Sequence, residues 1–171
     1  TDVSTCGGVS CATGFSGEVI YAAAATTGGQ VVVSGCTENS CAAYSFGAGV
    51  VGDGSSDACV DGVVLSSSSD GSCGAACAAG YSGANSTIVC ASDAAEGATT
   101  TGHPTCAENS CAAYRFGEGV VGGGSNPCTN GVVLSTRSSP SSCTVECGDG
   151  YVRISSTVSC PVTSTQDGAT A

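Results

Sequence analysis

The chain has 171 residues, a net charge of −11 and only three Lys and Arg residues. Nucleic acids and anionic membrane surfaces are bound by basic patches, so neither is expected as a partner. The longest apolar stretch, residues 19–25, is too short to cross a bilayer, and we expect no direct membrane insertion within this segment.

The chain contains 14 cysteines, a content typical of disulfide scaffolds. Zinc modules usually bring Cys-x-x-Cys pairs and histidines, but this chain has no such pair and a single histidine, His103. We therefore predict no metal and no cofactor, and an extracellular or cell-surface location. The predicted disulfide cysteines are Cys6, Cys11, Cys36, Cys41, Cys59, Cys73, Cys77, Cys90, Cys106, Cys111, Cys128, Cys143, Cys147 and Cys160.

The sequence repeats itself at a spacing of about 70 residues, which marks an array of modules. The cysteines of residues 36–90 return at 106–160, and ENSCAAYSFGAGVVGDGS returns as ENSCAAYRFGEGVVGGGS. We predict a partial Cys-rich module at 1–40, a complete six-cysteine module at 41–106, and a third module at 107–171 that stops before its closing cysteine. Each module has too few apolar residues to fold comfortably without covalent bridges.

The partial first module restricts the disulfide pattern. It lacks a counterpart of Cys90 but keeps counterparts of three other cysteines of the complete module. If no thiol is unpaired there, Cys90 pairs with Cys41 or Cys59. This leaves six of the 15 pairings that six cysteines allow.

The expected fold class is small, disulfide-rich, all-β and irregular. Glycine-rich stretches interrupt any helical period. The Val-Val-Leu sequences at 63–65 and 132–134 follow Asp-Gly and Asn-Gly turns, and they predict short strands. Residues 86–90 and 156–160 predict further strands, and we expect at most one helical turn, near 94–96.

The repeat contains the pattern C-x3-C-x2-GY, written here as SCGAACAAGY and SCTVECGDGY. The chain resembles a sushi module at Cys77, Gly80-Tyr81, Gly83, Cys90 and Pro104-Thr105-Cys106. It lacks the usual Trp of that module and has Cys73 in addition. The sequence more closely resembles the tandem Cys-rich, EGF-like or sushi-like repeats of algal and protist extracellular surface proteins, including mastigoneme-like filament proteins. The resemblance implies a surface or filament protein.

Catalytic and metal-binding patterns are weak. An array of enzymatic modules would repeat its base and nucleophile, whereas His103 is not repeated, so we predict a loop histidine and no enzyme. Asp53, Asp57 and Asp61 suggest a calcium loop. The second copy has Gly123, Pro127 and Asn130 instead, so turn formation is the preferred interpretation.

An aromatic pair recurs in both copies, at Tyr44 and Phe46 and at Tyr114 and Phe116. Residues two apart on a strand share one face. This face is expected to form the small core or the contact between modules. The alternative is an apolar contact for a neighbouring chain or a sugar.

Asn85 begins the sequon Asn-Ser-Thr, and we predict N-glycosylation there. Asn39 and Asn109 begin the rarer Asn-x-Cys form, and both are expected to be weak sites.

Modules that contact mainly their neighbours build extended arrays. We therefore expect a non-enzymatic structural subunit of an extracellular filament or cell-surface coat, glycosylated and associating with itself, with other extracellular matrix proteins or with glycans. The alternative is an adhesive or glycan- or ligand-binding ectodomain, in which the repeats act as spacer and recognition surface.

Overall fold

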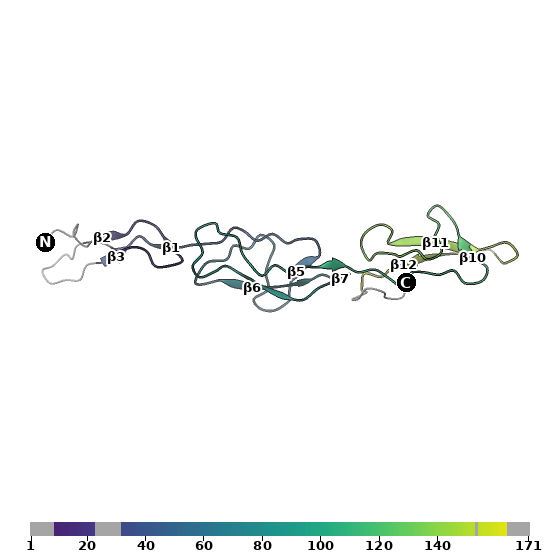
Figure 1. Cartoon of the computed structure of the whole chain (residues 1–171), viewed down its shortest axis with the longest axis horizontal. Coiled ribbons are helices and arrows are strands. Elements are labelled where there is room, and N and C mark those ends of the chain that lie inside the picture. The colour runs from purple at the N-terminus through teal and green to yellow at the C-terminus, as the bar shows by residue number, and fades with distance from the viewer. Residues whose placement is uncertain (1–8, 23–31, 153, 164–171) are drawn as a thin grey trace. The chain divides into compact units, whose positions relative to one another are not determined.

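The computed structural model describes residues 9–22, 32–152 and 154–163. These residues form short strands, isolated bridges and turns, and they include no helix, as Figure 1 shows. The predicted all-β, disulfide-rich, irregular fold is therefore confirmed. No helix capable of spanning a bilayer is present in this described part of the chain.

The strands are two to six residues long. In chain order they are β1 (Phe15–Ser16), β2 (Ile20–Ala22), β3 (Val32–Ser34), β4 (Thr37–Glu38), β5 (Val50–Gly52), β6 (Ser72–Cys77), β7 (Tyr81–Ser82), β8 (Ser86–Val89), β9 (Ala107–Glu108), β10 (Val120–Gly122), β11 (Ser142–Cys147) and β12 (Ser155–Ser159).

The strands form small separate sheets. Two three-stranded sheets have the orders β5-β6-β8 and β10-β11-β12, and two-stranded sheets join β1 to β4, β2 to β3 and β7 to β9. The strands predicted at 86–90 and 156–160 are confirmed as β8 and β12.

The two Val-Val-Leu sequences form isolated bridges instead of strands. Val63 pairs only with Tyr44, and Val132 only with Tyr114. In the first copy, the Tyr44 N–H donates to the Val63 carbonyl. Residues 60–63 form a tight turn, in which the Val63 N–H donates to the Val60 carbonyl. On the other side of this pair the bonds continue to Ser40 opposite Ser66, but one segment advances four residues and the other three, so the extra residue interrupts a regular ladder.

The chain divides into two compact units. Unit 1 comprises Thr1–Phe46, Gly54–Ala75 and Ser86–His103. Unit 2 comprises Gly47–Asp53, Ala76–Asn85 and Pro104–Ala171. Each unit contains a disulfide-bridged two-stranded ribbon followed by a disulfide-rich core. In unit 2, β7 belongs to the predicted module at 41–106, whereas β9 and the core belong to the module at 107–171, so this compact unit combines parts of two modules.

We call the two ribbons the first and second ribbon. The first contains β1 and β4 and is bridged by Cys11–Cys36. The second contains β7 and β9 and is bridged by Cys77–Cys106. Both have the same antiparallel register, which places Phe15 opposite Glu38 and Tyr81 opposite Glu108.

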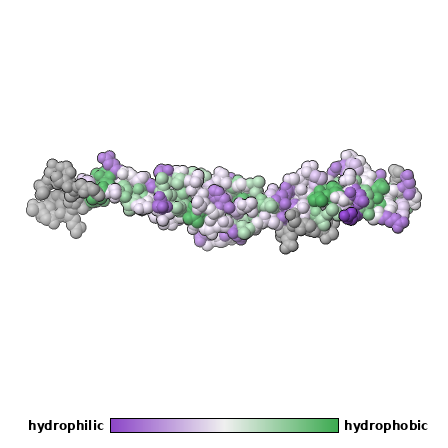
Figure 2. Space-filling view, in the orientation of Figure 1, coloured by the Kyte–Doolittle hydropathy of each residue, from purple (hydrophilic) through white to green (hydrophobic). Residues whose placement is uncertain are grey.

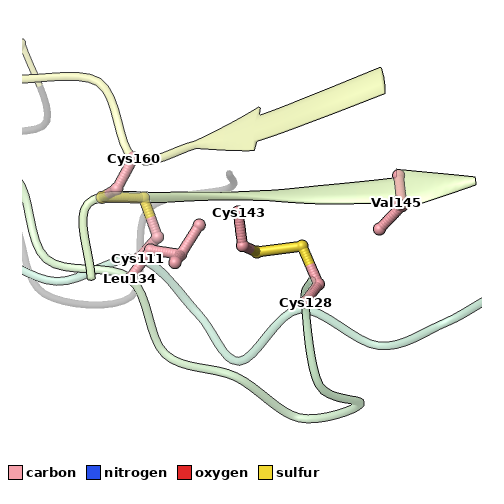
Figure 3. Close-up of a cluster of buried hydrophobic side chains, with 6 residues drawn as sticks. All are labelled: Cys111, Cys128, Leu134, Cys143, Val145 and Cys160. Atoms are coloured by element: carbon pink, nitrogen blue, oxygen red, sulfur yellow. A yellow bond between two sulfur atoms is a disulfide. The ribbon is translucent and has the colours of Figure 1, made fainter. Parts of the chain in front are cut away.

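Disulfides make up much of each core. In unit 2 the buried cluster has six residues, and four of them are the bridged cysteines of Cys111–Cys160 and Cys128–Cys143. Figure 3 shows Cys143 and Val145 projecting from the same side of β11, with Leu134 beside Cys111. The equivalent bridges in unit 1 are Cys41–Cys90 and Cys59–Cys73, which accompany the buried Leu65 and Ile88.

The expected partner of Cys90 is confirmed as Cys41, one of the two candidates. Within the described residues, Cys147 forms no disulfide, and Cys6 lies outside them. The six disulfides are consistent with an oxidising, secretory-pathway environment.

Candidate functional site: a repeated joint between ribbon and core

Each compact unit holds its ribbon to its core through the same set of polar contacts. We call each set a joint. Joint 1 comprises Gly14, Glu38 and Asn39 of the first ribbon with the loop at residues 67–69 of the core. Joint 2 comprises Gly80, Glu108 and Asn109 with the loop at 136–138.

A buried glycine lies at the centre of each joint. Gly14 and Gly80 have φ of +80° and +83°, a left-handed conformation that glycine adopts without steric cost. A Cβ on Gly14 would lie 2.3 Å from the Ser92 carbonyl oxygen. A Cβ on Gly80 would lie 3.0 Å from Thr136 Oγ1. The core therefore approaches the Gly14 backbone too closely for a side chain, whereas a side chain at Gly80 would require Thr136 to shift.

The glycine carbonyl in joint 1 accepts two hydrogen bonds. The Asn39 N–H donates to the Gly14 oxygen at 2.8 Å, and the Ser67 hydroxyl donates to it at 2.6 Å. The Ser67 N–H donates in turn to the Asn39 carbonyl at 2.9 Å. These bonds tie the ribbon backbone directly to the core loop.

Joint 2 repeats this pattern with a threonine. The Asn109 N–H donates to the Gly80 oxygen at 2.9 Å, and Thr136 Oγ1 donates to it at 2.7 Å. The Thr136 N–H donates to the Asn109 carbonyl at 3.0 Å. Ser67 and Thr136 are each 3% exposed, so both hydroxyls are inside the joint.

A glutamate carboxylate closes each joint. In joint 1, Glu38 Oε1 accepts from the Ser68 N–H at 2.6 Å and from the Ser69 N–H at 2.7 Å. The hydroxyls of Ser68 and Ser69 also donate to this carboxylate. In joint 2, Glu108 accepts from the Arg137 N–H at 2.7 Å and from both the N–H and the hydroxyl of Ser138.

These donors stabilise the ionised carboxylates. The hydrogen bond from the Ser68 hydroxyl, followed by that from the Ser69 N–H, lowers the pKa of Glu38 from 4.5 to about 2. The pKa of Glu108 is also lowered, first by the Ser138 hydroxyl and to the smallest extent by the charge of Arg137. Both glutamates are therefore acceptors for the core loop at neutral pH.

A buried asparagine follows each glutamate. Asn39 and Asn109 are 5% and 1% exposed. The Asn39 amide donates to the Ala94 carbonyl at 2.8 Å, while Asn109 Oδ1 accepts from the Ser82 hydroxyl. Burial leaves no room for a glycan, so the weak sequons at these two positions serve the joint instead.

The recurring aromatic pair belongs to the cores. The ring centroids of Tyr44 and Phe46 lie 5.9 Å apart with an edge-on geometry. Those of Tyr114 and Phe116 lie 6.0 Å apart in the same arrangement, against the buried cluster of unit 2. Tyr44 is 7% exposed, and burial raises its pKa.

His103 stacks on Tyr44 with ring centroids 4.9 Å apart, and its Nε2 lies 2.9 Å from Thr100 Oγ1. These residues line a surface hollow of about 240 Å³ together with Ala42, Ala43, Ser45 and Thr99. The hollow offers hydroxyls and one imidazole.

Asp61, one of the three aspartates considered as a calcium loop, binds a backbone N–H. Asp61 Oδ1 accepts from the Phe46 N–H at 2.7 Å, and Asn130 Oδ1 accepts from the Phe116 N–H at 2.9 Å. Asp and Asn perform the same task in the two copies, which explains why the charge is not repeated. The residues that the structure describes contain no group of three or more metal-ligating side chains.

The predicted glycosylation residue, Asn85, is exposed in the irregular segment before β8. On the face shown in Figure 2, the described surface is mostly pale, between the hydrophilic and hydrophobic extremes. This is the appearance expected of a surface rich in Ser, Thr, Gly and Ala.

The joints were not predicted from the sequence. Their signal was present, because the motif Cys-x-Glu-Asn occurs at Cys36 and again at Cys106, and hydroxyl residues recur at 67–68 and at 136 and 138. Comparison of the chain with protein-family models, curated proteins and solved structures found no match.

Proposed function

We propose that the chain is a non-enzymatic structural subunit of an extracellular filament or cell-surface coat. The observation that carries the proposal is the repetition of the joint. The two joints use the same glycine carbonyl, the same glutamate carboxylate and the same buried asparagine.

A repeated joint is what an array needs in order to grow by identical steps. A contact that is the same at each step lets successive modules be added without a new interface each time. Each ribbon and each core is also bridged, so the array resists proteolysis and unfolding.

Negative-stain microscopy of native material tests the proposal. Regular filaments or a coat lattice with an axial repeat are expected. Monodisperse short particles that bind glycans or cells would contradict it and would favour the adhesive ectodomain, with the hollow beside Tyr44 and His103 as its first candidate surface.

The proposed extracellular location carries a separate test at Asn85. Native protein should lose the mass of an N-glycan from the peptide that contains Asn85 after enzymatic deglycosylation. The peptides that contain Asn39 and Asn109 should show no change, because both asparagines are buried.

A further inference from the structure

The chain contains a third copy of the segment that starts each ribbon. The first two copies begin at Cys11 and Cys77, and the third, CGDGY, begins at Cys147. In all three, glycine is the fourth residue and has a left-handed φ, which is +87° at Gly150. We call residues 147–152 the third ribbon segment.

The third ribbon segment already has the conformation of the others. The Tyr151 N–H donates to the Gly148 carbonyl at 3.3 Å, as the Tyr81 N–H donates to Ala78 at 3.0 Å. The Gly148 N–H donates to the Gly119 carbonyl at 2.8 Å, which repeats the bond from Ala78 to Gly49.

The aromatic ring of this segment is also in place. A Cβ on Gly119 would lie 2.7 Å from the Tyr151 ring, and a Cβ on Gly49 would lie 2.4 Å from the Tyr81 ring. Each tyrosine ring therefore lies directly against a glycine, Tyr81 against Gly49 and Tyr151 against Gly119. The segment is preorganised, so binding a partner requires little ordering.

The third segment differs from the others in what covers it. Gly14 and Gly80 are buried in joints, whereas Gly150 is exposed, with nothing within 4 Å of a Cβ built on it. Tyr151 and Val152 are 52% and 81% exposed. Among the described residues, no strand pairs with them as β4 pairs with β1 and β9 with β7.

We infer that the third ribbon segment is a docking surface for a strand of the type Cys-x-Glu-Asn, carried by a further module of this repeat. The inference rests on the proposed function and names its partner. The docked strand would repeat an interface that the chain already forms twice, in which a strand of this type pairs with the ribbon segment.

The docked strand would take a defined register. Its glutamate lies opposite Tyr151, as Glu108 lies opposite Tyr81, and its cysteine reaches Cys147, as Cys106 reaches Cys77. The bridge forms by thiol–disulfide exchange. Cys147 loses its proton to solvent, its thiolate attacks a mixed disulfide between the arriving cysteine and glutathione, the new S–S bond forms, and glutathione leaves as a thiolate.

The experiment uses the full chain with Cys6→Ser, so that Cys147 is the target thiol. The probe is the peptide PTCAENS, which is residues 104–110 of this chain, supplied as its glutathione mixed disulfide. The control is a peptide of the same composition with a scrambled order and the same mixed disulfide. Intact mass under non-reducing conditions measures the linked fraction, and peptide mapping locates the bridge.

We expect the native-order peptide to link to Cys147 about tenfold or more efficiently than the scrambled peptide, because docking raises its effective concentration beside the thiol. Tyr151→Ala should remove the difference while leaving far-ultraviolet circular dichroism unchanged. Equal linking of the two peptides would overturn the inference, because Cys147 would then be only an accessible thiol. This result is independent of filament formation, so it is distinguishable from a failure of the proposed function.

Discussion

The two joints perform one task with different residues, and their comparison separates what is required from what is exchangeable. Both keep a left-handed glycine, a glutamate and a buried asparagine. The loops that receive them differ: joint 1 uses residues 67–69, which are all serine, and joint 2 uses Thr136, Arg137 and Ser138. The ribbon side is therefore the constrained partner, and the loop side needs only a buried hydroxyl and N–H groups directed at a carboxylate.

The cores differ more than the joints. Ile88 is fully buried in unit 1, whereas Val158 at the equivalent position of unit 2 is only half-buried. Unit 1 also has His103 stacked on Tyr44. Unit 2 thus relies more heavily on its disulfides, and stability measurements on the two units can test this difference.

The largest expected effect comes from the long core bridges. Cys41–Cys90 and Cys111–Cys160 each span 49 residues, and a loop of this size contributes about 4 kcal/mol in the chain-entropy model. Replacing both cysteines of a bridge by alanine should raise hydrogen exchange throughout the affected unit. Unit 2 should lose more protection than unit 1. Equal loss, measured peptide by peptide with mass spectrometry, would show that the apolar difference is immaterial.

The joint glycines should give the next largest effect. Gly14→Ala places its Cβ against the backbone oxygen of Ser92, whereas Gly80→Ala meets a side chain that can shift. Both variants also strain a left-handed backbone, at a cost of about 1–3 kcal/mol. Denaturant titration should show Gly14→Ala to be the more damaging. Gly62→Ala is the matched control, because Gly62 has φ +79° but nothing near its Cβ.

Removing the buried hydroxyls should cost about 1 kcal/mol each, the usual net value of one hydrogen bond. Ser67→Ala and Thr136→Val each delete the donor to a glycine carbonyl. Because both joints use the same bond, the two losses should agree within error. A loss confined to one variant would show that the joints are not equivalent. Chemical denaturation of each variant provides the measurement.

Acidification should weaken both joints. A carboxylate whose pKa is lowered in the folded state stabilises the fold above its unfolded pKa, and this contribution disappears as the pH falls through the folded pKa. For Glu38 the window runs from 4.5 down to about 2. Unfolding measured across this range should lose part of its pH dependence in Glu38→Gln. An unchanged pH profile would contradict the hydrogen bonds described for Ser68 and Ser69.

Salt should produce the smallest difference. Only Glu108 has a cationic neighbour, Arg137, among the groups that lower its pKa. Screening weakens an exposed charge–charge interaction but leaves short hydrogen bonds largely intact. Adding 1 M NaCl should raise the pKa of Glu108 slightly more than that of Glu38, as measured by nuclear magnetic resonance titration. Arg137→Ser should abolish the difference.

The sequence predicted part of the covalent framework: it left six pairings open, and its prediction of a bridge at Cys147 was wrong within the residues that the structure describes. The absence of a Cys90 counterpart reduced the choice for that residue to two partners, and Cys41 is the one observed. Strands at 86–90 and 156–160 also followed from their β-branched residues. Strands of this kind can be predicted from the sequence because they depend on neighbouring residues and not on contacts with distant ones.

The joints could not be predicted in the same way. Glu38 meets Ser68 across 30 residues, and nothing local marks a surface serine as a carboxylate partner. Likewise, the compact units combine parts of successive modules, whereas a sequence repeat shows only the period and not where a unit begins. For Asp61 the repeat itself was informative: Asn130 in the second copy favoured turn formation over a calcium loop, and both side chains accept from a backbone N–H.

The overlap of two disulfide loops sets how far the middle of the chain can be stretched. Cys77 lies inside the loop closed by Cys41–Cys90, and its partner Cys106 lies outside it. The shortest covalent path from Cys41 to Cys106 therefore crosses one bridge, runs through the 13 residues from Cys90 back to Cys77, and crosses the second. At about 3.5 Å per residue, and with Cα–Cα distances of 5.8 Å and 5.5 Å across the two bridges, this path spans about 57 Å even when fully unfolded, against about 230 Å for the unbridged segment. A chain bridged in this way can be extended only a little by pulling before a covalent bond must break.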